Sequence, residues 1–500
     1  MNGTRELIIS QTTAWVTDAS EKNDTLQSNI YWIYGLPGIG KTSLAHSICD
    51  KLDEQKQLIG AFFCQRDDTN LSDPRNILPT LIYKLVEVLP PFRKIVTESL
   101  RKSPNLTAES MKDTIFLDFI RSLPPHPTEH SIAFVIDALD ECGNTQSRRD
   151  VLMALTDAVA QAPWFKIIVI SRPEADIRRF FNSLVSLPHS SYDLATDPKA
   201  NDDLRTFARS QFSLLALQWH LPVSWPGESD FNRVISRANG LFIFIKTLVL
   251  ALKKCEDPEE SLKDVLQGST GTGLKSLYGL YSSILKAHSN IGGFWRMIIV
   301  ITTAQYRPLC KGPIAKLTGV KPNLLETFVD GLSSLLYRDE EANGAIRVRH
   351  LSISDFILSD SCNYQDKLRD AHTRQGIACL ETMVKQLRFN ICKLADSRLA
   401  NSEVKDLQPQ IEQNISDPLQ YSSLYWSNHL CFSPDNIGRD PQVLGRLKEF
   451  FEGLYPLFWI EVLSIMGMVP VSAPSLRRVI SLVKVSTDKW RARHSGSNLL

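Results

Sequence analysis

The sequence predicts an α/β protein built on a parallel sheet, and two patterns support this fold class. The first is a set of short runs of apolar, aromatic and β-branched residues, which are typical of strands buried on both faces. The second is the helical periodicity of the segments between those runs. The strands are expected at residues 30–34, 58–64, 131–136 and 164–170, and the helices at 44–52, 76–89, 108–123 and 148–160.

The first strand runs directly into a glycine loop. Gly35 is followed by four residues and then by Gly40, Lys41 and Thr42, which is the spacing of a phosphate-binding loop. Glycines let successive backbone N–H groups curl around an anion, and the helix that follows points its positive end at the phosphates. Lys41 can reach the β- and γ-phosphates, and the Thr42 hydroxyl can ligate Mg²⁺. We therefore expect a nucleoside triphosphate to bind at Gly35, Gly38, Ile39, Gly40, Lys41, Thr42 and Ser43.

The third strand ends in acidic residues that suit a magnesium-dependent site. Asp137 lies at the carboxyl end of this strand, where parallel sheets bind ligands, and we expect it to hold Mg²⁺ together with Thr42. Asp140 and Glu141 follow one turn later, so either could orient or deprotonate an attacking water. Ala138 stands directly after Asp137, where many fast ATPases have glutamate. We therefore expect slow hydrolysis.

The fourth strand delivers Ser171 and Arg172 to the same edge of the sheet. An arginine at this position can bind the γ-phosphate and respond to its loss. The alternative is a surface arginine in a turn that Pro173 closes. We assign Arg172 to nucleotide binding because the preceding strand is apolar throughout.

Composition limits the possible partners and compartments. The formal net charge is +1, which argues against a dedicated nucleic-acid binder. The nine cysteines are scattered without zinc-site spacing, which fits a reducing compartment. The start of the chain is too polar for a secretory signal, and the longest apolar runs are too short to span a bilayer. We expect a soluble, cytoplasmic protein without a membrane partner.

These motifs resemble the NACHT branch of the signal-transducing P-loop NTPases, the STAND class. Within that branch, the chain is similar to fungal NOD-like receptors, to heterokaryon-incompatibility proteins and to the nephrocystin-type NTPase domain. The resemblance covers nearly the whole chain. Besides the glycine loop and the acidic strand, the matching segments are Gly3-Thr4-Arg5 with Trp15, 60–64, 72–75, 171–174, 237–243 and 277–285.

The resemblance implies an order of domains. It implies an ASCE-type P-loop sheet that is followed by a helical lid, a winged helix and an α-helical region. The segment around His350 is similar to the histidine motif of NOD-like receptors, in which a histidine contacts the diphosphate of the resting state. An imidazole N–H could donate to a β-phosphate oxygen, although a purely structural histidine is the alternative. The expected boundaries are 1–28 for an N-terminal helix and linker, 29–195 for the NTPase domain, 196–268 for the lid, 269–362 for the winged helix and 363–500 for the helical region.

The expected helical region carries an aromatic stripe at helical spacing, which we interpret as a core face rather than a binding face. The stripe consists of Tyr421, Tyr425, Trp426, His429 and Leu430. No internal repeat is evident in the sequence. In the resembling proteins a repeat-built sensor often follows this region, so we expect that sensor to be absent or the sequence to be a fragment. No effector domain is expected before the glycine loop.

Together these features predict a nucleotide-operated switch that is at most a slow NTPase. Bound diphosphate would bridge the sheet domain and the winged helix, and exchange for triphosphate would remove the His350 contact. The domains would then separate and expose a surface for self-association. The expected setting is innate-immunity or incompatibility-type signalling, with a repeat sensor or effector protein as a possible further partner. Whether the purine nucleotide is ATP or GTP stays open.

Two other functions fit part of the sequence. An initiator-type DNA-linked ATPase also joins a P-loop sheet to a winged helix, and DNA should stimulate its hydrolysis. A small-molecule kinase would need an acceptor site near the glycine loop, and the sequence has no motif for one. The near-neutral charge disfavours the first alternative, and the long helical tail has no role in the second.

Overall fold

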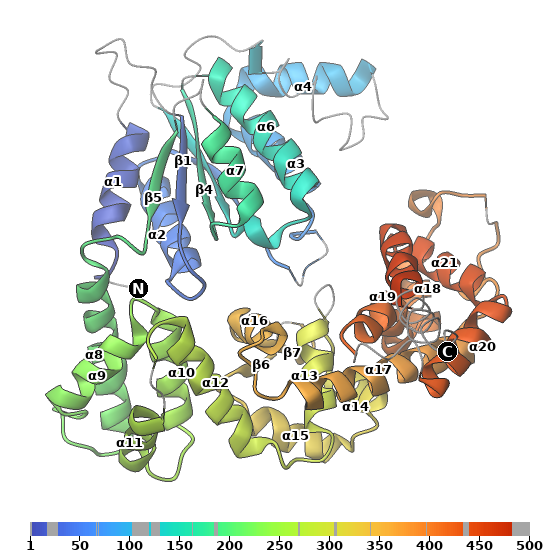
Figure 1. Cartoon of the computed structure of the whole chain (residues 1–500). Helices are drawn as coiled ribbons and strands as arrows, with labels where there is room; N and C mark the ends of the chain where they lie inside the picture. The colour runs from blue at the N-terminus through green and yellow to red at the C-terminus, as the bar shows by residue number, and fades with distance from the viewer. Residues whose placement is uncertain are drawn as a thin grey trace, which may run out of the picture. The chain divides into compact units, whose positions relative to one another are not determined.

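The computed structural model divides into two compact units, Met1–Leu280 and Tyr281–Leu500, and each is described by itself. Figure 1 shows the helices and strands of both units. The predicted helix at 108–123 lies almost entirely outside the described residues. The structure describes residues 3–17, 29–66, 68, 70–102, 120–121, 131–162, 164–184, 189–268, 271–304, 308–340, 342–396, 398–433 and 440–482.

The first unit is centred on a five-stranded sheet with the order β2-β3-β4-β1-β5. Every neighbouring pair of strands is parallel. This order and direction are those of an ASCE-type P-loop sheet, so the predicted fold class is confirmed. The edge strand β5 was not predicted, because its sequence is polar. The strands are β1 (Ile30–Tyr34), β2 (Leu58–Phe63), β3 (Ile132–Asp137), β4 (Phe165–Ser171) and β5 (Ser190–Asp193).

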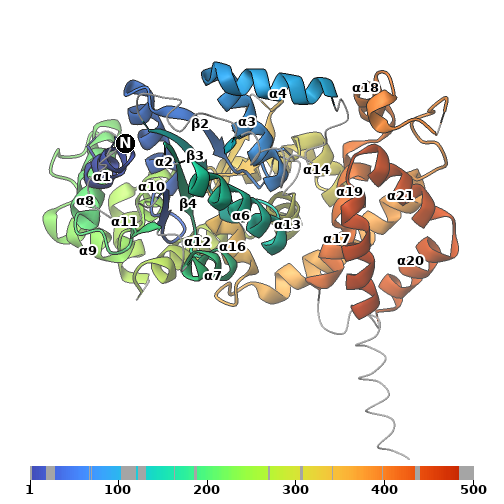
Figure 2. The ribbon, with the colours of Figure 1, turned by 90° about the horizontal axis from the view of Figure 1, so that it is seen from above.

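Helices cover both faces of this sheet, as Figure 2 shows from above. Along β1, Tyr31 and Ile33 pack into the core on one face, while Ile30 and Trp32 pack into the core on the other. Burial on both faces explains why the strands β1 to β4 are mostly apolar and were predictable. The first face is covered by α1 (Glu6–Thr17) and α2 (Lys41–Glu54), and the second by α3 (Ile77–Val88), α6 (Thr145–Gln161) and α7 (Ala175–Ser183).

Four helices follow the sheet within the first unit. They are α8 (Ala200–Gln218), α9 (Glu228–Ala238), α10 (Phe242–Leu252) and α11 (Pro258–Gly268). The sequence has helical periodicity from 230 to 254 and predicts one helical stretch there, but the structure divides this stretch into two helices. Asn239 and Gly240 adopt left-handed φ angles of 44° and 82°, so α9 ends there and α10 begins anew. The helix predicted at 76–89 ends before Pro90, as expected, because α3 stops at Val88. Pro90 also starts a further helix, α4 (Pro90–Lys102), since proline is tolerated in the first turn of a helix.

The second unit begins within α12 (Leu274–His288) and contains a winged helix. Three helices are followed by an antiparallel two-stranded sheet. The strand Leu336–Asp339 pairs with the strand Ala345–Val348, and Asp339 lies opposite Ala345. The elements are α13 (Phe294–Thr303), α14 (Lys311–Thr318), α15 (Pro322–Gly331), β6 (Leu336–Asp339) and β7 (Ala345–Val348).

The rest of the second unit is helical, as predicted. A Cβ on Gly376 of α17 would lie 2.6 Å from the Leu430 side chain, so this glycine allows close packing against α19. The aromatic stripe on α19 is buried, which confirms its interpretation as a core face. The helices are α16 (Ser352–Leu358), α17 (Gln365–Gln386), α18 (Leu407–Asn414), α19 (Asp417–Cys431), α20 (Pro441–Glu452), α21 (Tyr455–Ile465) and a final one at 472–482.

A buried pair of histidines joins α17 to α19. His372 Nδ1 lies 2.8 Å from His429 Nδ1, and His429 Nε2 lies 2.8 Å from the Tyr421 hydroxyl. Burial lowers the pKa of His372 to about 4. Burial also lowers the pKa of His429, and the neighbouring His372 lowers it further. Both imidazoles are therefore neutral at pH 7.

We expect this pair to make the chain less stable in mild acid. The unfolded chain, with histidine pKa values near 6.5, takes up protons between pH 6.5 and 4 that the folded His372 does not. The free energy of unfolding should therefore fall as pH drops from 7.5 to 5, by about 2 kcal/mol from His372 alone. Denaturant titrations of the full chain at both pH values measure this. His372→Gln should flatten the pH dependence and exposed His46→Gln should not; equal pH dependence in all three proteins would contradict the prediction.

Candidate nucleotide-binding site

The carboxyl ends of three strands meet at one edge of the sheet. Tyr34, the last residue of β1, pairs with Ser171, the last residue of β4, and Asp137 ends the adjacent strand β3. The Gly35 N–H donates to the Ser171 carbonyl at 3.4 Å. Thus the glycine loop, the acidic segment and Arg172 all begin at the same edge, as the sequence predicted for a parallel sheet.

The glycine loop adopts a backbone that requires glycine at two positions. Gly38 and Gly40 have φ angles of +81° and +96°, which a side chain would strain. Gly40 is the residue that precedes α2, and its carbonyl accepts the first helical hydrogen bond from the Leu44 N–H at 3.0 Å. Ser43 lies in the first turn of α2. This helix therefore directs its positive end into the loop.

The Lys41 side chain folds back onto the start of the glycine loop. Its Nζ donates to the carbonyl oxygens of Gly35 and Leu36, each at 2.9 Å. Burial lowers the pKa of Lys41 to about 8, while the charge of Asp140 acts in the opposite direction. At pH 7 the ammonium is thus still charged and partly stripped of water, which favours binding to an anion.

Asp137 and Thr42 form the part of the site that suits a divalent cation. Asp137 is 2% exposed, and its Oδ1 has no hydrogen-bond partner among the described residues. Burial raises the pKa of Asp137 to about 6, against a hydrogen bond from Thr42 that lowers it. A buried carboxylate oxygen without a partner, next to a hydroxyl, is a donor set that Mg²⁺ accepts. The residues present therefore fit this ion.

The two acidic residues after β3 have different surroundings. Asp140 accepts a hydrogen bond from the Arg172 N–H at 2.8 Å and forms an ion pair with Arg172 Nε at 3.2 Å. Its carboxylate is thus engaged with the predicted γ-phosphate sensor. Burial, with help from the charge of Asp140, raises the pKa of Glu141 to about 7. Of the two, Glu141 has the pKa that suits a general base near neutral pH.

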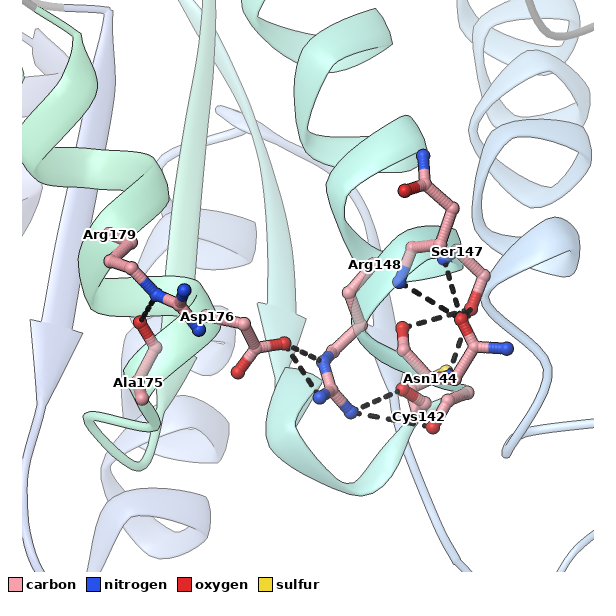
Figure 3. Close-up of polar contacts among 9 residues, drawn as sticks. Cys142, Asn144, Ser147, Arg148, Ala175, Asp176 and Arg179 are labelled. Carbon is pink, nitrogen blue, oxygen red and sulfur yellow. Dashed lines mark hydrogen bonds and ion pairs between the residues drawn. The ribbon is translucent and has the colours of Figure 1, made fainter.

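A partly buried ion pair supports the loop that carries these acids, as Figure 3 shows. Arg148 on α6 contacts the Asp176 carboxylate of α7 at 2.6 Å, and both side chains are 13% exposed. The same guanidinium donates to the carbonyl oxygens of Cys142 and Gly143 at 3.1 and 3.4 Å. It therefore connects the loop after Glu141 to the helix that follows Arg172. The sequence did not reveal this pair, because the two residues lie 28 positions apart and their helices come into contact only when the chain folds.

Comparison with known proteins agrees with this geometry. Residues 10–172 match the family model of the nephrocystin 3 N-terminal domain. The chain carries a NACHT-type NTPase domain. It is also 24% identical over 496 residues to the vegetative incompatibility protein HET-E-1 of Podospora anserina. That alignment covers 92% of this chain and 35% of the relative, so the chain spans about a third of the relative's length.

Two solved structures to which the chain is similar are a Walker-type ATPase and an Orc1 protein. The Walker-type ATPase PABY2304 of Pyrococcus abyssi is 14% identical, with a TM-score of 0.30, and the match covers 66% of this chain and 91% of that one. The Orc1 protein of Aeropyrum pernix, solved in complex with DNA, is 13% identical, with a TM-score of 0.28, and the match covers 70% and 91%. Similarities at this level do not support a function. Within the described residues, no helix is long and apolar enough to cross a membrane.

His350 lies in the second unit, outside the NTPase domain, between β7 and α16. Its Nδ1 accepts a hydrogen bond from the Ser352 N–H at 3.1 Å and lies 2.6 Å from the Ser352 hydroxyl. The Tyr281 hydroxyl lies 2.7 Å from the same hydroxyl oxygen. Because Nδ1 is an acceptor, the proton of the neutral ring is on Nε2. The ring therefore has a fixed tautomer with Nε2–H as its donor.

Proposed function

We propose that the chain is a nucleotide-operated switch of the STAND type, in which the number of bound phosphates controls contacts between its domains. The observation that carries the proposal is the phosphate site itself. A glycine loop with two left-handed residues, a desolvated Lys41, and an Asp137 carboxylate oxygen without a hydrogen-bond partner among the described residues converge on one edge of the sheet. Together these residues are suited to binding the polyphosphate of ATP or GTP.

Magnesium is proposed as the cofactor of this site, held by Thr42 and Asp137. When bound, the ion would neutralise charge on the phosphate oxygens. Lys41 would bind the β- and γ-phosphates, and Gly35, Gly38, Ile39, Gly40 and Ser43 would form the rest of the cradle. Glu141 would accept a proton from the attacking water. Asp140 would hold Arg172 ready for the γ-phosphate.

Slow hydrolysis fits a switch better than a metabolic enzyme. Ala138, next to Asp137, has a left-handed φ of 54° and turns the chain so that Asp140 and Glu141 follow one turn later. The base is therefore displaced from the position directly after the magnesium-binding strand. We infer a long-lived triphosphate state, which a switch requires.

The switch needs a group that distinguishes the two nucleotide states, and we propose Arg172 and His350 for this role. Arg172 would bind the γ-phosphate, while the Nε2–H of His350 would donate to the β-phosphate of bound diphosphate. A ligand shifts such an equilibrium only by its different affinity for the two states. Triphosphate would release the winged helix and allow self-association. The relationship to HET-E-1 supports a role in incompatibility-type signalling.

This proposal predicts that nucleotide state controls assembly. Light scattering after gel filtration should detect larger species with a non-hydrolysable triphosphate and magnesium than with diphosphate. His350→Ala should release diphosphate about tenfold faster, since it removes one hydrogen bond to a charged group. Identical mass in both nucleotide states, together with an unchanged release rate in His350→Ala, would contradict the switch. Hydrolysis that rises on addition of duplex DNA would favour the DNA-linked ATPase instead.

A further inference from the structure

Arg5 is buried between the glycine loop and the first helix after the sheet. The residue is 4% exposed, and its Nη1 lies 2.6 Å from Asp197 Oδ2, a carboxylate whose side chain is 1% exposed. Its Nη2 donates to the carbonyl oxygen of Ile39 at 3.3 Å. Its backbone N–H donates to Asp203 Oδ2 of α8 at 3.0 Å. One residue from the start of the chain thus contacts both the phosphate loop and the helical lid.

The backbone of Arg5 is itself constrained. Its φ angle is +60°, in the left-handed region that residues other than glycine rarely adopt. Such a conformation persists only where surrounding contacts impose it. The contacts with Asp197, Asp203 and Ile39 are numerous enough to do so.

The lid makes a second contact with the same loop. The Ile243 N–H, in the first turn of α10, donates to the Gly38 carbonyl at 3.1 Å. The first N–H groups of a helix have no partner within the helix, so this bond satisfies one of them. The Arg5 guanidinium also lies 5.5 Å from the centre of the neighbouring Phe242 ring. Two consecutive carbonyls of the loop therefore accept hydrogen bonds that involve the lid. The Gly38 carbonyl is bound by Ile243 of the lid, and the Ile39 carbonyl is bound by Arg5, which is paired with Asp197 of the lid.

A hydrogen bond to a carbonyl oxygen also determines the direction of the N–H group in the same peptide unit. In a planar trans peptide the C=O and the following N–H point in opposite directions. Because Arg5 binds the Ile39 carbonyl, the Gly40 N–H is directed away from Arg5. Backbone N–H groups of such a loop are the ones that bind phosphate oxygens.

We propose that Arg5 is a positioning residue of the nucleotide site. It orients the Ile39–Gly40 peptide for phosphate binding and, through Asp197, ties that peptide to the lid. Phosphate affinity then depends on the lid being seated, so that movement of the lid loosens the loop and releases nucleotide. This inference rests on the proposed nucleotide-binding function and assigns a role to the Gly3-Thr4-Arg5 motif.

The test compares three variants of the full chain with the unaltered protein. Arg5→Lys keeps a cation for Asp197, but a single ammonium nitrogen replaces the two separate nitrogens, Nη1 and Nη2, with which Arg5 contacts Asp197 and the Ile39 carbonyl. Arg5→Met removes the cation. Lys166→Met is the matched control, because Lys166 is also a buried cation that anchors α1, donating to the Trp15 carbonyl at 2.5 Å. Lys166 lies at the amino end of β4, at the opposite edge of the sheet from the loop.

The measurements are the dissociation constants of fluorescent ATP, GTP, ADP and GDP with magnesium, and the melting temperature without nucleotide. We expect Arg5→Lys to weaken binding about tenfold with little change in melting temperature, and Arg5→Met to weaken it more. Lys166→Met should lower the melting temperature and leave binding unchanged. If Arg5→Met does not fold, because Asp197 has lost its cation, Arg5→Lys carries the test.

Failure of the inference differs from failure of the proposed function. If the unaltered protein binds no nucleotide, the proposed function fails. If it binds and Arg5→Lys binds equally well, Arg5 does not position the loop. Equal weakening by Arg5→Met and Lys166→Met would also overturn the inference, since anchoring of α1 alone would then explain both.

Discussion

Replacing Lys41 with alanine is expected to weaken binding of purine triphosphate by roughly 100-fold, which is the loss of charge-assisted hydrogen bonds to phosphate. Lys41 is the cation that the glycine loop holds at its mouth, and its desolvation strengthens the attraction to an anion. Equilibrium titration with fluorescent ATP and GTP measures the change. The melting temperature without nucleotide should change little, because among the described residues the Lys41 ammonium donates its hydrogen bonds to two loop carbonyls, each at 2.9 Å.

A matched control lies on the same helix. Lys51 is exposed and pairs with Glu54 at 2.7 Å, so Lys51→Ala should bind nucleotide like the unaltered protein. If Lys41→Ala keeps full affinity, or if Lys51→Ala loses as much, the loop is not the phosphate site.

Replacing Glu141 with glutamine is expected to slow hydrolysis by roughly 100-fold at unchanged nucleotide affinity, as the loss of a general base does. Burial raises the pKa of Glu141 to about 7, whereas Asp140 is bound to Arg172. Asp140→Asn should therefore change the ratio of the affinities for triphosphate and diphosphate more than it changes the rate constant of hydrolysis. Single-turnover assays with labelled triphosphate and excess protein separate these effects.

The same assay can reverse the assignment. If Asp140→Asn stops hydrolysis while Glu141→Gln does not, Asp140 is the base and Glu141 has another role. Exposed Glu54→Gln on α2 serves as the control for loss of a carboxylate. Hydrolysis that persists in all three variants would contradict any role of this acidic segment in catalysis.

Four strands of the central sheet could be predicted because most of their residues face apolar surroundings. A strand buried on both faces, such as Phe165–Ser171, is apolar at most positions and has Lys166 as its buried cation. The edge strand Ser190–Asp193 has one neighbour, β1, and a polar sequence, so no pattern distinguished it from a loop. The break between α9 and α10 depends on two left-handed residues, Asn239 and Gly240, within an otherwise helical pattern.

The site was predictable where its residues are close in sequence. Gly35 to Ser43 form one segment, and Asp137 and Arg172 each end a strand, so the sheet edge brings them together. The contacts of Arg5 with Asp197, and of Arg148 with Asp176, join residues that are far apart in the chain. Such pairs depend on how helices pack on the sheet, and no spacing rule in a single sequence specifies that. The ion pair between Asp140 and Arg172 likewise joins residues that are distant in the sequence, so the sequence alone did not reveal it.

The most direct measurement identifies the nucleotide that the purified, folded full chain contains, by mass spectrometry after denaturation. Titration of the same protein with labelled ATP and GTP then measures uptake. The account predicts that a purine di- or triphosphate co-purifies, and that uptake of triphosphate requires magnesium and Lys41. Folded protein that contains no purine nucleotide, and takes up neither ATP nor GTP in the presence of magnesium, would contradict it.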